Sequence, residues 1–187
     1  MAPLTRVWFF TLNANHSIIE AAFRKFWNEI LTTAAAYSSF GEPHVLLQSD
    51  DEPDQLALIS GYPTQEASLE LQQAWGDKLV PRVLEFITHK QLLISDLDVR
   101  ELPLDSGKIA VLVKDDYNAA AETELPGHGT WATEMPSLLF DTAAKEAAQQ
   151  RRCWVQVAAS EDVDRLRAAG YTRKFSSIME VRIVASE

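Results

Sequence analysis

The chain has 187 residues, 47% of them hydrophobic, and a net charge of −10 from 27 acidic and 17 basic side chains. Its length suits two compact halves that share a sheet, and its apolar fraction is enough to build a core, which excludes an intrinsically disordered chain. Because no run of Lys or Arg reverses the negative charge locally, the composition argues against nucleic acid and an anionic membrane surface as partners.

The cysteine content and the first residues indicate where the protein works. Cys153 is the only cysteine, so an intrachain disulfide is impossible and a secreted disulfide scaffold is excluded. Its neighbours Trp154 and Val155 predict a buried, unreactive thiol on a strand. The apolar run at residues 7–12 is too short for a membrane span or a signal sequence, which predicts a cytoplasmic protein.

The first half of the chain alternates apolar runs with amphipathic segments. Ser17 and Glu20 form a capping-box pattern, which predicts that a helix begins at Ser17. Thr64 is placed to cap a second helix, which Gly76 and Pro81 break into two parts. Strands are predicted at residues 7–12, 43–48, 55–61 and 90–99. The order strand–helix–strand–strand–helix–strand is that of a ferredoxin-like fold.

The second half repeats this pattern in a shortened form, after a turn-rich connector at residues 100–107. Strands are predicted at residues 108–113, 153–158 and 174–184, and helices at residues 137–150 and after Ser160. Residues 115–136 form one long connection, which is typical of a functional loop. One strand of the repeat is therefore missing from the second half.

The sequence thus predicts an α+β protein with antiparallel sheets. Its two tandem ferredoxin-like halves, residues 1–99 and 107–187, are expected to form an intramolecular α+β barrel, a pseudo-dimer on one chain.

Two segments resemble a known superfamily. Residues 48–53, Gln-Ser-Asp-Asp-Glu-Pro, and residues 58–67, Leu-Ile-Ser-Gly-Tyr-Pro-Thr-Gln-Glu-Ala, are similar to the dimeric α+β barrel superfamily, and more narrowly to the fungal branch of the antibiotic-biosynthesis monooxygenase group. Residues 86–96 resemble the fourth strand of polyketide cyclases with this fold. The resemblance implies a pocket beneath the helices of each sheet. Members include cofactor-free oxygenases, cyclases, decarboxylases and haem-degrading enzymes, so the fold does not select the function.

The chain departs from this superfamily where related proteins carry histidine. Ser68 stands after the Glu-Ala of the second helix, and Trp75-Gly76 stands where the cyclases place a catalytic histidine. The resemblance therefore does not carry the catalytic histidines of the cyclases over to this chain.

Three other histidines are candidates for an acid/base role, because histidine exchanges protons near neutral pH. His16 lies at the mouth between the first strand and the first helix. His89 begins the fourth strand, where alternation predicts that it shares a face with Gln91 and Ser95. His128 lies between two glycines in the long connection, and glycine lets a backbone approach a ligand closely. A solvated side chain is the alternative for each.

Four further side chains are candidates for substrate contacts, with a packing role as the alternative for each. Trp75 is expected to form a pocket wall because the second helix breaks beside it, and Trp131 is expected to stack on an aromatic substrate. Tyr62 ends the third strand and is a candidate proton donor. Asn13 lies at the predicted pocket mouth. His44, which opens a strand, is expected at the surface.

No metal-ligand spacing and no phosphate-binding glycine loop is present, so no metal or nucleotide cofactor is expected. The sequence predicts a cofactor-independent biosynthetic enzyme that oxygenates, cyclises or rearranges a hydrophobic aromatic or polyketide-type molecule, with a histidine as acid/base. We expect a closed, apolar pocket of roughly a few hundred Å³ that contains a histidine. A non-catalytic small-molecule-binding protein, a haem-binding protein, and pairing of the chain as a homodimer all remain open.

Overall fold

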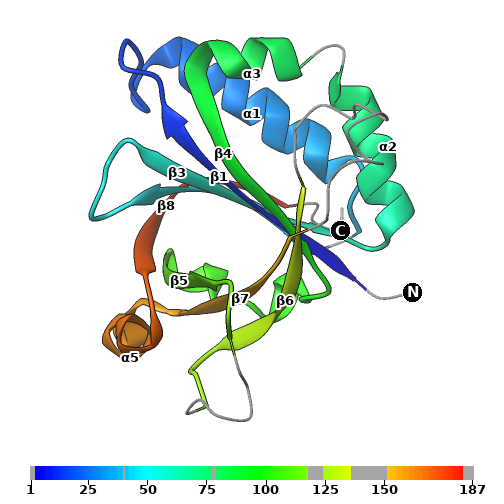
Figure 1. The fold of residues 1–187 in the computed structure, drawn as a ribbon. Coiled ribbons are helices and arrows are strands. Elements are labelled where there is room, and N and C mark those ends of the chain that lie inside the picture. Colours follow the sequence, from blue (N-terminus) through cyan, green and yellow to red (C-terminus); the bar gives the residue numbers. More distant parts are fainter. Residues whose placement is uncertain (1–2, 40, 77–78, 118–123, 136–150, 183–187) are drawn as a thin grey trace.

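Eight antiparallel strands close into a barrel in the computed structural model, which describes residues 3–39, 41–76, 79–117, 124–135 and 151–182 (Figure 1). The strand order around the barrel is β1-β3-β2-β8-β5-β7-β6-β4. The strands are β1 Leu4–Leu12, β2 Pro43–Ser49, β3 Gln55–Tyr62, β4 Ile87–Ser95, β5 Lys108–Lys114, β6 His128–Met135, β7 Arg152–Ala159 and β8 Thr172–Arg182. The predicted α+β class with antiparallel pairing is confirmed.

The described helices lie outside the barrel (Figure 1). Helices α1 Ala21–Ala35, α2 Gln65–Gly76 and α3 Val80–Phe86 cover the outer face of the first four strands, and α5 Val163–Ala169 packs beside β5 and β8. Three 3₁₀ turns complete the fold: η1 Val99–Glu101, η2 Leu104–Ser106 and η3 Ser160–Asp162. None of the described helices has the length and apolar character needed to cross a membrane.

The strand order contains the same pattern twice. The first four strands run β4-β1-β3-β2 across the sheet, and the last four run β8-β5-β7-β6, which is the same order with each number raised by four. Strand pairs β2–β8 and β4–β6 join the two sets, so both junctions are made of hydrogen-bonded antiparallel strands. This arrangement leaves no strand of the barrel with an unpaired edge.

The strand missing from the second half is β6, His128–Met135, and the prediction of one long connection at residues 115–136 is therefore wrong. Along β6 only Ala132 is buried, so the strand lacks the alternation of apolar residues that would reveal it. The helix predicted at residues 137–150 lies outside the described residues.

Two other predicted boundaries are also wrong. Helix α1 begins at Ala21, because the Glu20 carboxylate pairs with His16 at 3.0 Å instead of completing the capping box, and the Ser17 hydroxyl accepts only from the Ile19 amide. Strand β4 begins at Ile87, directly after α3, and ends at Ser95. The prediction that Thr64 caps α2 is confirmed by its side-chain bond with the Ala67 amide, 3.2 Å long.

The barrel interior is filled by side chains. Alternate residues of β1 point to opposite faces, so Val7 and Phe9 face the interior while Trp8 and Phe10 face the helices. The interior cluster draws on all eight strands, and Val99, Leu102 and Leu104 of the connector pack into it. On the other face, the rings of Phe10 and Trp27 stack with centroids 5.0 Å apart. The centre of the barrel is therefore packed with side chains.

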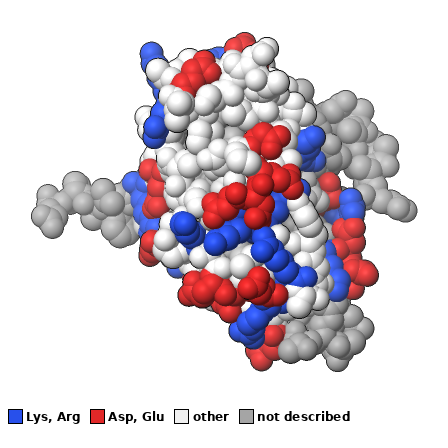
Figure 2. Space-filling view, turned by 90° about the vertical axis from the view of Figure 1, so that its left-hand side faces the viewer, with Lys and Arg blue, Asp and Glu red and all other residues white. Residues whose placement is uncertain are grey.

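Acidic and basic side chains are interleaved on the face that carries α5 and the β2–β3 turn (Figure 2). Arg167 of α5 pairs with Asp51 of that turn at 2.8 Å, and the Tyr171 hydroxyl donates to Glu52 at 2.9 Å. These exposed contacts join residues of the two ranges 1–99 and 107–187. Each contributes little to stability on its own because solvent screens it.

Gly61 of β3 packs closely against Val99 of the connector. A Cβ at Gly61 would lie 2.0 Å from Cγ1 of Val99, whereas a Cβ at Gly76 would meet nothing within 4 Å. We expect Gly61→Ala to lower the free energy of unfolding by about 1–3 kcal/mol through overpacking. Urea denaturation measures this, with Gly76→Ala as the matched control.

Addition of Val99→Ala to Gly61→Ala should recover part of the loss, because it removes the clashing methyl group. A loss in the double variant that equals the sum of the losses in the two single variants would contradict the close packing of Gly61 against Val99.

Candidate functional site

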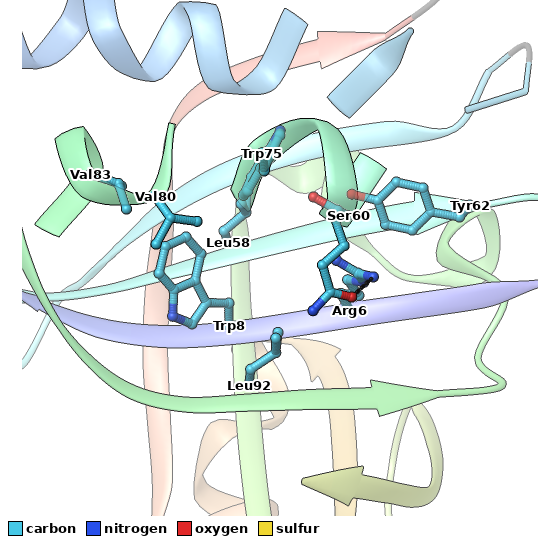
Figure 3. Close-up of a pocket in the computed structure, with 10 residues that line it drawn as sticks. Arg6, Trp8, Leu58, Ser60, Tyr62, Trp75, Val80, Val83 and Leu92 are labelled. Atoms are coloured by element: carbon cyan, nitrogen blue, oxygen red, sulfur yellow. Dashed lines mark hydrogen bonds between the residues drawn. The ribbon is translucent and has the colours of Figure 1, made fainter. Parts of the chain in front are cut away.

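A pocket lies between the outer face of the first four strands and the helices α2 and α3 (Figure 3). Its apolar lining consists of Trp8, Leu58, Trp75, Val80, Val83 and Leu92, and its polar lining of Arg6, Ser60, Tyr62 and Gln72. The space between these side chains, including the part open to solvent, is about 530 Å³, and the centres of water-sized molecules can occupy about 40 Å³ of it. The enclosed part has room for roughly three water molecules, so a larger ligand would extend into the part open to solvent.

The polar and apolar side chains occupy different ends of the pocket. Figure 3 shows Arg6, Ser60 and Tyr62 together at one end, with Trp8, Val80 and Val83 at the other. Strand alternation produces this arrangement, because Arg6 and Trp8 share the helix-facing side of β1, and Leu58, Ser60 and Tyr62 share that of β3. The helix break after Gly76 places Trp75 over the pocket.

Arg6 is the cation of this pocket, and only 8% of its surface is exposed. Its Nη2 donates to the Ser68 carbonyl at 2.7 Å and to Gln72 Oε1 at 3.0 Å, and its guanidinium lies 5.4 Å from the centroid of the Tyr62 ring. Desolvation lowers the pKa of Arg6, yet a guanidinium remains protonated in proteins. No carboxylate lies within ion-pair distance of Arg6 among the described residues.

Three polar atoms of the pocket lining are buried without a hydrogen-bond partner in the described part of the chain: Arg6 Nε, Ser60 Oγ and Trp75 Nε1. Each of them can donate a hydrogen bond, and the two nitrogens can only donate. An unsatisfied buried donor costs about 1–3 kcal/mol. The pocket therefore contains hydrogen-bond donors for which the described residues supply no acceptor.

A second polar layer lies behind Tyr62. Burial raises the pKa of the Tyr62 hydroxyl, and the nearby Arg6 charge opposes that effect. His44 is fully buried, its Nε2 lies 2.6 Å from the Ser38 hydroxyl, and its ring packs edge-on against Tyr62. Burial lowers the pKa of His44 to about 4, so the imidazole is neutral at pH 7. The expectation that His44 lies at the surface is wrong.

His89 does not line the pocket but contacts a residue that does. The Trp8 indole donates to His89 Nδ1 at 2.9 Å, which leaves the ring proton of neutral His89 on Nε2. Desolvation lowers the pKa of His89, and the Glu134 carboxylate partly opposes it. The prediction that His89 shares a face with Gln91 is wrong, because a bulge shifts the register so that Phe9 pairs with Gln91 and Phe10 with His89.

The remaining predicted residues lie apart from the pocket. His16 contacts Glu20 and the ring of Phe86, 4.7 Å away, at the start of α1. The Asn13 amide donates to the Leu84 and Glu85 carbonyls, so it joins the end of β1 to α3. These contacts give both residues a packing role.

His128 and Trp131 lie on β6, on the other half of the barrel. His128 is exposed and 3.9 Å from Glu101, and the Trp131 ring packs edge-on against Trp154. The flanking Gly129 approaches β7 rather than an open space, because a Cβ there would lie 1.8 Å from Gln156 Oε1. The sequence-predicted site residues are therefore not brought together: Trp75 and Tyr62 share the pocket, and His16, Asn13, His128 and Trp131 do not.

Sequence reasoning missed Arg6, Ser60 and Gln72. Arg6 fell one residue outside the predicted first strand, although its spacing of two from Trp8 places it on the helix-facing side. Ser60 and Tyr62 show the same spacing on β3. A basic residue in phase with the helix-facing side of a buried strand is the signal that could have found this site.

One mouth of the barrel forms another, more open hollow, whose space of about 700 Å³ includes the part open to solvent. Its charged groups already have partners: Arg151 pairs with Asp115, and Arg173 lies over the rings of Phe9 and Tyr171. Among the described residues, no group of three or more His, Cys, Asp or Glu side chains is placed to hold a metal ion. Cys153 is buried, and burial raises its pKa to about 11, which agrees with an unreactive thiol.

Comparisons with known proteins relate the chain to other structures by fold. No family model and no curated protein matches the sequence. An anthrone oxidase-like protein matches over 100% of this chain and 98% of its own, with a TM-score of 0.54 and 13% identity. A protein named as a chlorite dismutase matches over 96% of both chains, with a TM-score of 0.48 and 7% identity. At 13% identity, the likeness to the anthrone oxidase-like protein shows the fold alone.

The buried neutral His44 should make stability depend on pH. Because its pKa is depressed on folding, the unfolded chain binds the extra proton, so stability is complete above about pH 6.5 and falls as pH drops toward 4. The expected loss over this window is about 3 kcal/mol. Urea denaturation from pH 4 to 7.5 measures it. His44→Gln should flatten the profile relative to the His128→Gln control, and an unchanged profile would contradict the burial of a neutral imidazole.

The Glu134 carboxylate should raise the pKa of His89 in the folded protein. We therefore expect Glu134→Gln to lower the pKa of His89 further, since only desolvation then remains. Titration of the His89 ring protons by NMR measures the direction of this change. A rise in the pKa would show that another group controls it.

Proposed function

We propose that the protein is a small-molecule enzyme that acts, without a metal or nucleotide cofactor, on a mainly apolar molecule held in the pocket under α2 and α3. The observation that carries this proposal is the division of the pocket into an apolar end and a polar end that contains one buried cation. Such a lining excludes water from the body of a ligand and fixes the orientation of its polar group.

We further infer that residues 1–99 and 107–187 are two ferredoxin-like halves of a pseudo-dimer. The repeated strand order β4-β1-β3-β2 and β8-β5-β7-β6 supports this inference, as does the placement of α1 and the α2–α3 pair over the first set. The pocket beneath those helices is in the place that the superfamily resemblance implies. A closer relation to the antibiotic-biosynthesis monooxygenases remains part of this proposal.

Cofactor-free oxygenation of an aromatic substrate is the reaction that we favour. The name of one structural neighbour, an anthrone oxidase-like protein, supports an aromatic substrate of this kind. In such a reaction the substrate loses a proton and its anion donates an electron to oxygen. Arg6 would stabilise the negative charge, and the apolar lining from Trp8 to Leu92 would keep water away from it.

His89 is the proton acceptor that we propose, because the Trp8 indole of the pocket wall joins it to the pocket. Its basic Nδ1 accepts from that indole, so proton transfer to His89 requires this hydrogen bond to open. A non-catalytic binding protein is the second candidate. It is favoured by a different observation: no histidine or carboxylate is among the side chains described as lining the pocket.

Oxygen uptake by the purified protein tests this proposal. With anthrone as substrate and a chelator present, we expect the wild-type protein to consume oxygen above the uncatalysed rate. Val83→Trp should abolish the gain by filling the apolar end, and His89→Asn should lower it by about 100-fold through loss of the base. His128→Gln, on the opposite half of the barrel, is the matched control and should retain activity.

The outcomes separate the alternatives. Ligand binding without turnover in the wild-type protein would favour the non-catalytic candidate. A shifted Soret band on titration with haemin, lost in Val83→Trp, would favour haem binding in this pocket. Full activity in Val83→Trp would overturn the placement of the site.

A further inference from the structure

We propose that the ligand of this pocket is an organic carboxylate with a small apolar body, and that Arg6, Trp75 and Ser60 bind its carboxylate group. This inference rests on the proposed function for the location of the site and adds the chemical class of the ligand. Three observations carry it: a buried cation to which the described residues supply no counter-ion, hydrogen-bond donors without an acceptor in the same part of the chain, and an apolar space beside them.

The first observation concerns charge. Arg6 is removed from solvent, and its two hydrogen-bond acceptors, the Ser68 carbonyl and Gln72 Oε1, are both neutral. Buried charges in proteins are normally paired, because the cost of desolvation is otherwise several kcal/mol per ion, of the order of the whole stability of a domain. Among the described residues no negative charge is paired with Arg6, and a ligand that brings such a charge would complete the site.

The second observation concerns hydrogen bonds. Arg6 Nε and Trp75 Nε1 have no partner among the described residues and can only donate, and the Ser60 hydroxyl, which interacts with that of Tyr62, can donate as well. An ionised carboxylate accepts up to four hydrogen bonds and donates none, whereas an amide or alcohol brings donors of its own. A neutral ketone or phenol would satisfy one or two of these donors but brings no charge to Arg6 until it is deprotonated, whereas a carboxylate is already ionised at pH 7. The carboxylate is the common group that meets both needs.

The third observation concerns shape. The polar end leads directly to a wall of Trp8, Val80 and Val83, which offers nothing to an inorganic anion such as phosphate (Figure 3). An apolar body on the carboxylate would bury its surface there, at about 25 cal/mol per Å². The limited enclosed space favours a short or flat body, such as a propyl or phenyl group.

Matched pairs of acids and amides test this inference by calorimetry at pH 7. Benzoate and butyrate are compared with benzamide and butyramide, which have nearly the same shape without the charge. We expect each acid to bind at least about 10-fold more tightly than its amide, since a charge-assisted hydrogen bond contributes about 1.5–3 kcal/mol. Phosphate at the same concentration should not compete with benzoate.

Substitutions at Arg6 and Trp75 test whether these two residues cause the preference for the acid. Arg6→Gln should remove the preference for the acid, and Trp75→Phe should weaken benzoate by about 3–10-fold through loss of one donor while the ring is kept. Arg82→Gln is the control, because Arg82 is an exposed arginine that lies over the Phe26 ring and pairs with Glu29 outside the pocket. It should leave both affinities unchanged.

A change at Arg6 could also affect folding, so Trp75→Phe and the wild-type acid–amide comparison provide independent tests. Equal affinity for acid and amide in the wild-type protein would overturn the carboxylate assignment and leave the proposed pocket intact. Competition by phosphate would show an adventitious ion only and would also overturn it. Absence of binding by all four probes, with oxygen uptake on anthrone retained, would overturn this inference alone.

Discussion

Closure of the barrel is the constraint on which the rest of the structure depends. Each of the eight strands pairs on both sides, and the interior is occupied by one cluster of apolar side chains that the connector residues Val99 and Leu104 complete. A closed and filled barrel of this size offers no central channel. The candidate site lies instead on the outer face, in the pocket between the first four strands and the helices α2 and α3.

Strand β1 connects this constraint to the pocket, because both of its faces are buried. Val7 and Phe9 belong to the interior cluster, while Arg6 and Trp8 face the helices. A strand covered on both faces is expected to be apolar throughout, so a charged residue near its start is expected to lower the stability of the fold. Such conflicts concentrate at functional sites. The desolvated Arg6, the neutral His44 and the protonated Tyr62 form one polar layer within an otherwise apolar region.

The sequence predicts most of the fold because periodicity reports which faces are buried. It does not predict β6, because the residues of this strand are only partly buried and show no alternation. It also does not predict the bulge that turns His89 toward Trp8, because a single inserted residue does not change the hydrophobic pattern in a recognisable way. The site was predicted less well than the fold. The positions of Tyr62 and Trp75 at the ends of elements indicate their place in the pocket. Arg6 is recognised only by its burial without an ion-pair partner among the described residues, which depends on the packing of several elements.

The most direct test of this account is the proton–nitrogen NMR spectrum of the indole groups, one signal for each of the five tryptophans. Trp75 Nε1 and Trp27 Nε1 are both buried without a partner, but only Trp75 lines the pocket. On addition of benzoate, the account predicts a downfield shift of the Trp75 N–H signal as it gains an acceptor, with Trp27 unchanged and no such shift with benzamide. A Trp75 signal that benzoate leaves in place, or equal shifts of Trp75 and Trp27, would contradict it.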